Sequence, residues 1–198
     1  MDGSIFRWIN RLADRTSWAH DLFKANAGYG IVLFAVLLLV AYIDGRQHAD
    51  LTVVAASVWA ACAALVALGA GQIIGGAVDR ARPYETMANV HLLVDKTTDF
   101  SFPSDHATVA GAVAVGLLFA NRRWGIIASG LAIVMAFTRV YVGAHYPGDV
   151  LAGLALGGLV ATVGWFVIVP LLRRIATRLT TTQLRPLVTN AEPIAHSA

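Results

Sequence analysis

Residues Leu51–Val78 read LTVVAASVWAACAALVALGAGQIIGGAV, a run of 28 residues without a single charge. About 20 predominantly apolar residues are enough for a helix to cross the hydrocarbon core of a bilayer. Soluble domains carry charge on about a quarter of their residues, so an uncharged run of this length is foreign to them. The stretch therefore predicts a helix that spans a membrane.

The rest of the chain has the same character. Of its 198 residues, 57% are apolar and only 14% are charged. Further apolar runs recur along the sequence, and the shorter ones can be extended by a few tolerable residues at their ends. The chain therefore predicts an all-α fold, a polytopic transmembrane helix bundle of five to six spans within residues 28–172. The further runs are Gly28–Ile43, Ala107–Ala120, Gly125–Gly143 and Val150–Leu172.

The two ends of the chain differ from this core. In residues 1–27, apolar and charged side chains separate at helical spacing, which predicts amphipathic helices lying in the membrane interface. An ordinary surface helix packed on the bundle is the alternative. Residues 173–198 are first basic and then without periodicity, which predicts a cytoplasmic tail with a disordered end. The apolar set is Ile5, Phe6, Trp8, Ile9 and Leu12, and the charged set is Arg7, Arg11 and Asp14.

The arginine content of the loops predicts which side of the membrane each loop faces. If every run spans, residues 44–50, 121–124 and the tail share one side, and residues 79–105 and 141–149 share the other. The first side is rich in arginine, so the positive-inside rule places it in the cytoplasm. The second side then faces outward. The net charge of +3 reflects membrane-flanking arginine, and no nucleic-acid partner is expected.

The first outward loop holds a candidate anion site at Ser104 and His106. Pro103 blocks a helix upstream, and Ser104 is a favourable N-cap for the apolar run that follows. A helix start offers free N–H groups and the positive end of its dipole to an anion. His106 falls in the first turn, beside that position. Taken alone, it would more often be a capping or interfacial histidine.

Two arginines lie near the same face of the membrane. Arg139 interrupts an apolar run close to its outer end, where an unpaired charge costs a few kcal/mol. Arg82 precedes Pro83 near the bilayer surface. Either side chain alone could simply extend to the interface. Two guanidiniums beside a helix N-terminus form a clamp suited to a tetrahedral oxyanion.

The second outward loop adds a candidate nucleophile, His145. Pro147 and Gly148 predict the turn into the last span, so Asp149 falls in its first turn. A carboxylate at this spacing can hold one imidazole nitrogen and leave the other unprotonated. As an isolated pair, His145 and Asp149 would be at least as often structural. The one cysteine, Cys62, cannot form a thiolate metal site, and neither a metal nor a cofactor is expected.

Taken together, these motifs suggest a family. The chain resembles the type-2 phosphatidic-acid phosphatase superfamily of membrane lipid phosphatases, whose motifs are Lys-x6-Arg-Pro, Pro-Ser-x-His and Ser-Arg-x5-His-x3-Asp. The second motif is complete, and the third is complete except that Thr138 stands in place of serine. Their residues are Pro103, Ser104, His106, Arg139, His145 and Asp149.

The first motif departs from the family pattern. Arg82 and Pro83 are present, but Gly75 stands where the lysine is expected. Arg80 is expected to supply the compensating phosphate-binding charge, and a salt bridge with Asp79 is the alternative. In its small size and in this departure from the first motif, the chain resembles the bacitracin-resistance type of bacterial undecaprenyl-diphosphate phosphatase.

The resemblance implies a metal-independent hydrolase for a prenyl diphosphate that enters from the outer leaflet of a bacterial plasma membrane. Arg82, Ser104 and Arg139 would hold its terminal phosphate. His145, oriented by Asp149, would attack to form a phosphohistidine, and His106 would protonate the leaving group and then activate water. The alternatives are another lipid phosphate as substrate, a vanadate-binding haloperoxidase, or a channel, transporter or scaffold with a vestigial anion site.

Overall fold

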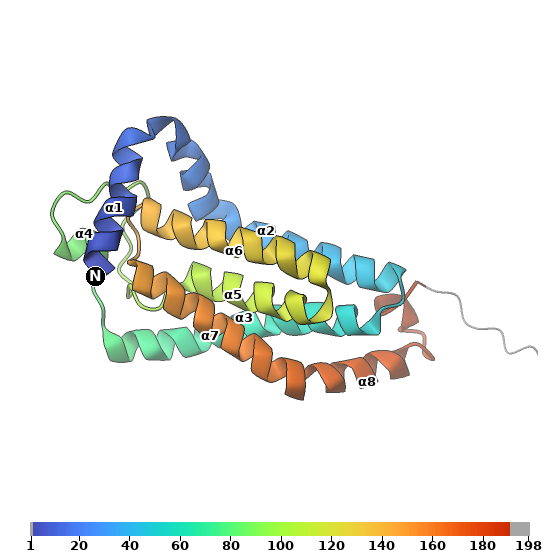
Figure 1. The fold of residues 1–198 in the computed structure, drawn as a ribbon. Coiled ribbons are helices and arrows are strands. Elements are labelled where there is room, and N and C mark those ends of the chain that lie inside the picture. The colour runs from blue at the N-terminus through green and yellow to red at the C-terminus, as the bar shows by residue number, and fades with distance from the viewer. Residues whose placement is uncertain (1, 191–198) are drawn as a thin grey trace, which may run out of the picture.

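The structure is a computed structural model that describes residues 2–190, and the described chain is built from helices and connecting loops without a strand (Figure 1). This confirms the predicted all-α class. The elements are α1 (Asp2–Arg15), η1 (Ser17–Ala19), α2 (His20–Gln47), α3 (Leu51–Val78), α4 (Pro83–Thr86), α5 (Asp105–Ala120), α6 (Arg122–Tyr141), α7 (Pro147–Val167), α8 (Val169–Leu179) and η2 (Arg185–Leu187).

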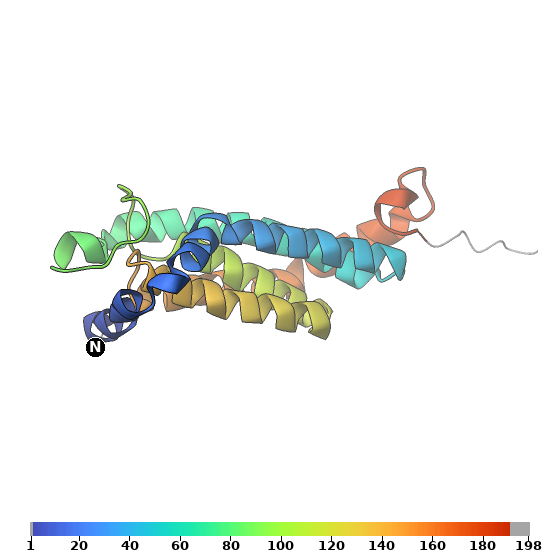
Figure 2. The ribbon, with the colours of Figure 1, turned by 90° about the horizontal axis from the view of Figure 1, so that it is seen from above.

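The bundle consists of five helices, α2, α3, α5, α6 and α7, which run side by side (Figures 1 and 2). Four of them, α2, α3, α6 and α7, lie in segments long and apolar enough to cross a membrane. The fifth, α5, has 16 residues, most of them buried. It packs against α7, α6 and α3, which together surround it. A transmembrane bundle centred on α5 is therefore the architecture, as the apolar runs predict.

Glycines bring the backbones of α5 and α7 into direct contact. A Cβ added to Gly157 would lie 2.0 Å from the carbonyl oxygen of Thr108, and one added to Gly111 would lie 2.3 Å from that of Leu154. Small residues of this kind let membrane helices approach closely, where packing and not hydrophobic burial provides the attraction. The approach places the start of α5 beside the start of α7.

The loops separate to the two ends of the bundle as predicted. At one end, the Trp124 indole donates to Asp44, 2.9 Å away, and the backbone N–H of Asn190 donates to the Arg46 carbonyl. At the other end, the backbone N–H of Ser104 donates to the Asp149 carbonyl at 3.1 Å. The two motif-bearing loops therefore meet at one end of the molecule.

Two predicted boundaries differ from the structure. The amphipathic segment expected up to residue 27 stops earlier, because α2 begins at His20 and runs unbroken into the apolar run. The run Val150–Leu172 is two helices, since Pro170 cannot donate a backbone hydrogen bond and the chain bends at Ile168 into α8. The basic segment after residue 172 is thus helical to Leu179. The disordered end predicted for the tail falls on residues 191–198, outside the described residues.

Helix α1 lies across the end of the bundle that carries the motif loops (Figure 1). Phe6, Asn10 and Ala13 are buried on its inner face. The Asn10 amide donates to the carbonyls of His91 and Tyr141 at 2.9 and 3.0 Å. On the outer face the Trp8 side chain is 67% exposed. One face of α1 is thus packed on the bundle, and the other is available to the membrane interface.

We expect Gly157→Ala to destabilise the protein, because its Cβ would collide with the backbone of α5. Overpacking of this kind lowers the free energy of unfolding by roughly 1–3 kcal/mol. Gly130→Ala is the matched control, since a Cβ there meets nothing within 4 Å and alanine favours a helix by up to about 1 kcal/mol. Thermal unfolding in detergent measures both; equal midpoints for the two variants would contradict the close α5–α7 packing.

Candidate active site

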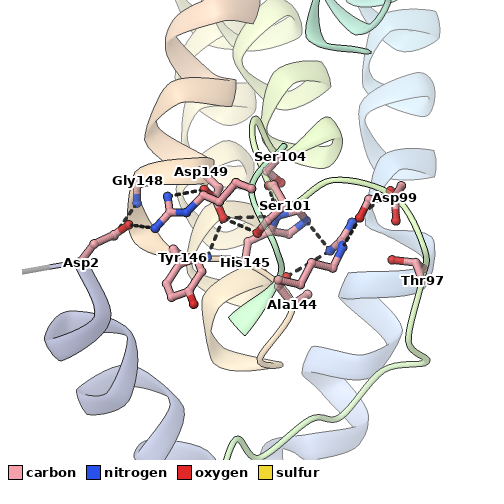
Figure 3. Close-up of polar contacts among 12 residues, drawn as sticks. Asp2, Thr97, Asp99, Ser101, Ser104, Ala144, His145, Tyr146, Gly148 and Asp149 are labelled. Atoms are coloured by element: carbon pink, nitrogen blue, oxygen red, sulfur yellow. Dashed lines mark hydrogen bonds and ion pairs between the residues drawn. The ribbon is translucent and has the colours of Figure 1, made fainter. Parts of the chain in front are cut away.

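His145 lies in the loop between α6 and α7, and its two ring nitrogens have different partners (Figure 3). Nδ1 is 2.8 Å from the carbonyl oxygen of Ser101, which can only accept, so Nδ1 must carry the proton. Nε2 is 3.2 Å from Nη1 of Arg82, which can only donate, so Nε2 must present its lone pair. The surroundings thus select the tautomer with an unprotonated Nε2.

Burial keeps this imidazole uncharged. The His145 side chain is 2% exposed, and desolvation lowers its pKa to about 4, opposed by Asp149 and assisted by the charges of Arg139 and Arg82. Above pH 5 the ring is therefore neutral. A neutral ring with a fixed tautomer is the form of histidine that acts as a nucleophile.

Asp149 is fully buried at the start of α7 and binds three groups. It accepts from Arg80 Nη1 at 2.6 Å, from Ser101 Oγ at 2.6 Å and from the backbone N–H of Tyr146 at 2.9 Å. Its distance to Nδ1 of His145 is 3.8 Å, beyond a hydrogen bond. The sequence suggested that Asp149 holds the imidazole directly. In the structure Asp149 accepts from the Ser101 hydroxyl, and the carbonyl of the same serine is the nearer partner of the ring.

Arg80 is committed to this carboxylate. Its guanidinium pairs with Asp149 and, at 2.5 Å, with Asp2 of α1, and it stacks 4.1 Å from the ring centroid of Tyr146. Asp2 in turn accepts from the backbone N–H of Gly148 (Figure 3). The sequence suggested that Arg80 binds phosphate or pairs with Asp79. In the structure its ion pairs are with Asp2 and Asp149. Because both ends of the guanidinium face carboxylates, we propose that Arg80 positions Asp149.

Arg82 is a buried clamp on the opposite side of His145. It is 4% exposed, and its guanidinium donates to the Ala144 carbonyl at 3.1 Å and pairs with the Asp99 carboxylate at 3.0 Å. Its Nε donates to the Asp99 carbonyl. These contacts fix the guanidinium with Nη1 directed at Nε2 of His145. Arg82 therefore has the fixed orientation that recognition of an oxyanion requires.

Two further buried side chains have hydrogen-bond donors that are not used within the described protein. Ser104 is the N-cap residue of α5, but its side chain makes no capping bond, and Oγ has no hydrogen-bond partner among the described residues. Nε of Arg139 likewise has none, and Nη1 makes one long contact, 3.4 Å, to the Ala27 carbonyl. Buried donors without partners are rare and costly. Here they stand beside the start of α5, where the sequence predicts an anion site.

An open cavity of about 700 Å³ reaches the second of these donors, Arg139. His106 and Arg139 lie in its wall, together with part of α2 and the loop before α5. The opposite approach is nearly closed, because the space near Gly75 measures only about 10 Å³. The lining residues of the cavity are Lys24, Ala27, Gly28, Leu92, Leu93, Val94, Asp95, Thr97, His106 and Arg139.

The glycine at position 75 has a physical explanation. A Cβ there would lie 2.9 Å from the Phe102 carbonyl oxygen and 3.2 Å from the Phe100 ring. Any larger side chain would push away the segment that carries Ser101, whose carbonyl holds His145. The loop conformation therefore excludes a lysine at Gly75.

Comparison with known proteins identifies the family. A family model described as the PAP2 superfamily matches residues 56–173. The chain belongs to the PAP2 superfamily. It is 32% identical to undecaprenyl-diphosphatase BcrC of Bacillus subtilis over 79% of this chain and 78% of that protein. It is 30% identical to an undecaprenyl-diphosphatase of Sulfolobus acidocaldarius over 79% of this chain and 73% of that protein.

A solved structure agrees on the fold. A transmembrane PAP2-type phosphatidylglycerolphosphate phosphatase from Bacillus subtilis aligns over 92% of this chain and 87% of its own, with a TM-score of 0.55 and 18% identity. Membership of this PAP2 family makes the protein a membrane hydrolase of lipid phosphates. Among the described residues, no group of three or more His, Cys, Asp and Glu is placed to hold a metal ion.

Several site residues escaped sequence reasoning. Ser101 lies two residues before the Pro-Ser-x-His motif, so its position in the sequence could have marked it as a site residue. Its contacts with Asp149 and His145 could not be read from the sequence. Asp99 and Asp2 have no such signal. Asp2 is 78 residues from Arg80 and 147 from Asp149 in the sequence, and only the fold brings the three together. Lys24 belongs to the predicted amphipathic segment and lies in the cavity wall.

We expect Arg80→Gln to lower kcat with little change in KM. The change leaves the buried Asp149 without its cation and displaces Ser101 and His145, and misplacement by about 1 Å can cost on the order of 10²-fold. Arg7→Gln, which removes the same charge from exposed α1, is the control. Steady-state kinetics decide the matter: a raised KM with an unchanged kcat would make Arg80 a phosphate contact instead.

The pKa of His145 sets the acid side of the pH profile. The nucleophile is the neutral form, which persists above its pKa of about 4, so kcat/KM should hold as pH falls to about 5 and decline near 4. An unperturbed histidine would give a decline near pH 6.5. His48→Gln, at the opposite end of the bundle, should leave the profile unchanged. An acid limb centred near 6.5 would contradict the buried, neutral His145.

Proposed function

We propose that this protein hydrolyses undecaprenyl diphosphate to the monophosphate and inorganic phosphate through a phosphohistidine on His145. The observation that carries the proposal is the tautomer of His145, with Nε2 unprotonated and facing Arg82 beside a set of buried donors. Two relatives that align over most of this chain bear the name undecaprenyl-diphosphatase. The proposed lipid substrate rests on the names of these relatives, and the proposed histidine chemistry rests on the geometry of the site.

Substrate binding would begin with the terminal phosphoryl group. Its oxygens would accept from Arg82, Arg139 and the Ser104 hydroxyl, together with the free N–H groups at the start of α5. In the free protein an N–H of Arg82 donates to Nε2 of His145. When substrate binds, this N–H would donate to a phosphoryl oxygen instead. The lone pair of Nε2 is thereby released at the moment when phosphorus arrives in front of it.

The reaction would proceed in two displacements. In the first, a bond forms between Nε2 of His145 and phosphorus while the bond from phosphorus to the bridging oxygen breaks. Protonated His106 gives its proton to the departing lipid phosphate. In the second, neutral His106 takes a proton from water, whose oxygen attacks phosphorus as the N–P bond breaks. Inorganic phosphate leaves, and both histidines return to their starting states.

Fixed charges would stabilise the transition state without a metal ion. Negative charge spreads over the equatorial phosphoryl oxygens during transfer. Arg82 and Arg139 are buried and oriented beforehand, so their positive charges are little screened and need no reorganisation. The same two guanidiniums that bind the substrate would thus lower the barrier.

The site would face outward from a bacterial plasma membrane. The arginine-rich end of the bundle carries Arg46, Arg122, Arg123 and the basic helix α8, which the positive-inside rule assigns to the cytoplasm. The catalytic loops lie at the opposite end. A substrate in the outer leaflet could enter the open cavity from the side, and its removal there would oppose bacitracin, in keeping with a relative named bacitracin transport permease BcrC.

Phosphate release from undecaprenyl diphosphate, phosphatidate and phosphatidylglycerol phosphate by purified protein in detergent with EDTA tests the proposal. We expect release from the prenyl diphosphate that resists EDTA and falls roughly 10⁴- to 10⁶-fold in His145→Ala. His48→Ala is the control. Rapid acid-free quenching of the His106→Ala variant should trap phosphate on His145. Preference for another lipid would change the substrate, and a metal requirement or an active His145→Ala would reject the mechanism.

A further inference from the structure

The cavity contains a lysine that the proposed mechanism does not use. Lys24 lies on α2, three and four residues before Ala27 and Gly28, so the three residues share one face of the helix. All three line the cavity that reaches His106 and Arg139. Lys24 is exposed, and its ammonium group has neither a hydrogen bond nor an ion pair within the described part of the chain.

Two other cations near the site are already engaged. Arg80 is held by two carboxylates and Arg82 by Asp99 and a carbonyl. The chain has only one other lysine, Lys96, which lies over the ring of Tyr84 at 5.8 Å and does not line the cavity. Two cations therefore line the cavity: Arg139, which is buried and makes one long contact to the Ala27 carbonyl, and Lys24, which is exposed and has no partner among the described residues.

The cations of the site form a series from the interior to the opening. Arg82 and Arg139 are 4% and 8% exposed, whereas Lys24 is exposed at the rim. In the reaction proposed above, a phosphoryl group in front of His145 would be bound by this inner pair. The next phosphate of a diphosphate, which joins it to the lipid, must then lie on the outer side. Lys24 is the cation available on that side.

The same helix face leaves room for the lipid. A Cβ added to Gly28 would meet nothing within 4 Å, and Ala27 beside it is small. On the α3 side, by contrast, Phe100 and Phe102 close the approach around Gly75. A substrate whose reactive phosphate is at His145 therefore has its path to the bilayer beside α2, where Lys24 stands.

We propose that Lys24 binds the lipid-side phosphate of a diphosphate substrate and thereby sets the preference for lipid diphosphates over lipid monophosphates. The proposal rests on the proposed function for the class of reaction. A lysine is suited to this position because its ammonium is a flexible point charge with three donors. It can follow a phosphate whose position varies with the lipid, while the rigid arginines hold the reacting group.

A matched pair of substrates tests this proposal. Farnesyl diphosphate and farnesyl phosphate share one tail and differ by the phosphate in question. We expect Lys24→Gln to lower kcat/KM for the diphosphate about 10- to 100-fold, the usual effect of losing one hydrogen bond to a charged group. The monophosphate should change less than about twofold. Lys24→Arg should keep most of the preference, and Lys96→Gln should alter neither substrate.

Asp95, which also lines the cavity, provides a further control. If Lys24 served only to neutralise Asp95, the double variant Lys24→Gln/Asp95→Asn would recover activity toward the diphosphate. We expect no recovery, because the lost partner is the phosphate. Equal loss on both substrates, no loss on either, or recovery in the double variant would each overturn the role of Lys24.

Binding separates this proposal from the proposed function. His145→Ala protein should bind a methylene-bridged farnesyl diphosphonate more tightly than farnesyl phosphonate, and Lys24→Gln in that background should abolish the difference. If the wild-type protein hydrolyses neither prenyl phosphate, the proposed reaction fails while this measurement still decides the role of Lys24. Equal affinities before the Lys24 change would overturn it.

Discussion

The buried carboxylate of Asp149 is the constraint on which the site depends. A charge out of contact with water costs several kcal/mol unless it is paired and hydrogen-bonded. Arg80, Ser101 and the backbone of Tyr146 together meet that requirement. These three partners come from both motif loops, so satisfying one charge fixes the loops relative to each other. Through the pair of Arg80 with Asp2, the same charge also holds helix α1 in place.

This arrangement divides the cations into two groups. Arg80 forms ion pairs with two carboxylates, whereas Arg139 has a buried N–H without a partner among the described residues. Arg82 belongs to both groups, since Asp99 anchors it while Nη1 faces His145. A polar site at the end of an apolar bundle can hold such unsatisfied donors because the surrounding packing is rigid. The result is preorganised affinity for an oxyanion.

Sequence reasoning succeeded where the signal was local. Uncharged runs of about 20 residues predicted the long helices, because a helix satisfies its backbone hydrogen bonds within one segment inside a bilayer. The motifs predicted that two separate loops lie on one side of the bundle, and the fold brings these loops together. It failed at boundaries set by context: Pro170 ended a run that hydropathy alone continued to residue 172, and α2 absorbed residues expected to lie apart from it. The pairing of Arg80 with Asp2 had no local signal, because Asp2 lies 78 positions away in the sequence.

The sequence by itself determined the helical membrane class, the identity of the histidines and arginines, and the end of the bundle where they meet, since periodicity, charge and motif order are written locally. Only the tertiary structure decided the tautomer of His145, the partners of Arg80, the exclusion of lysine at Gly75 and the place of Lys24 in the cavity wall. Each of these depends on contacts between segments far apart in the chain, and such contacts exist only after helices have packed and buried charges have found their partners.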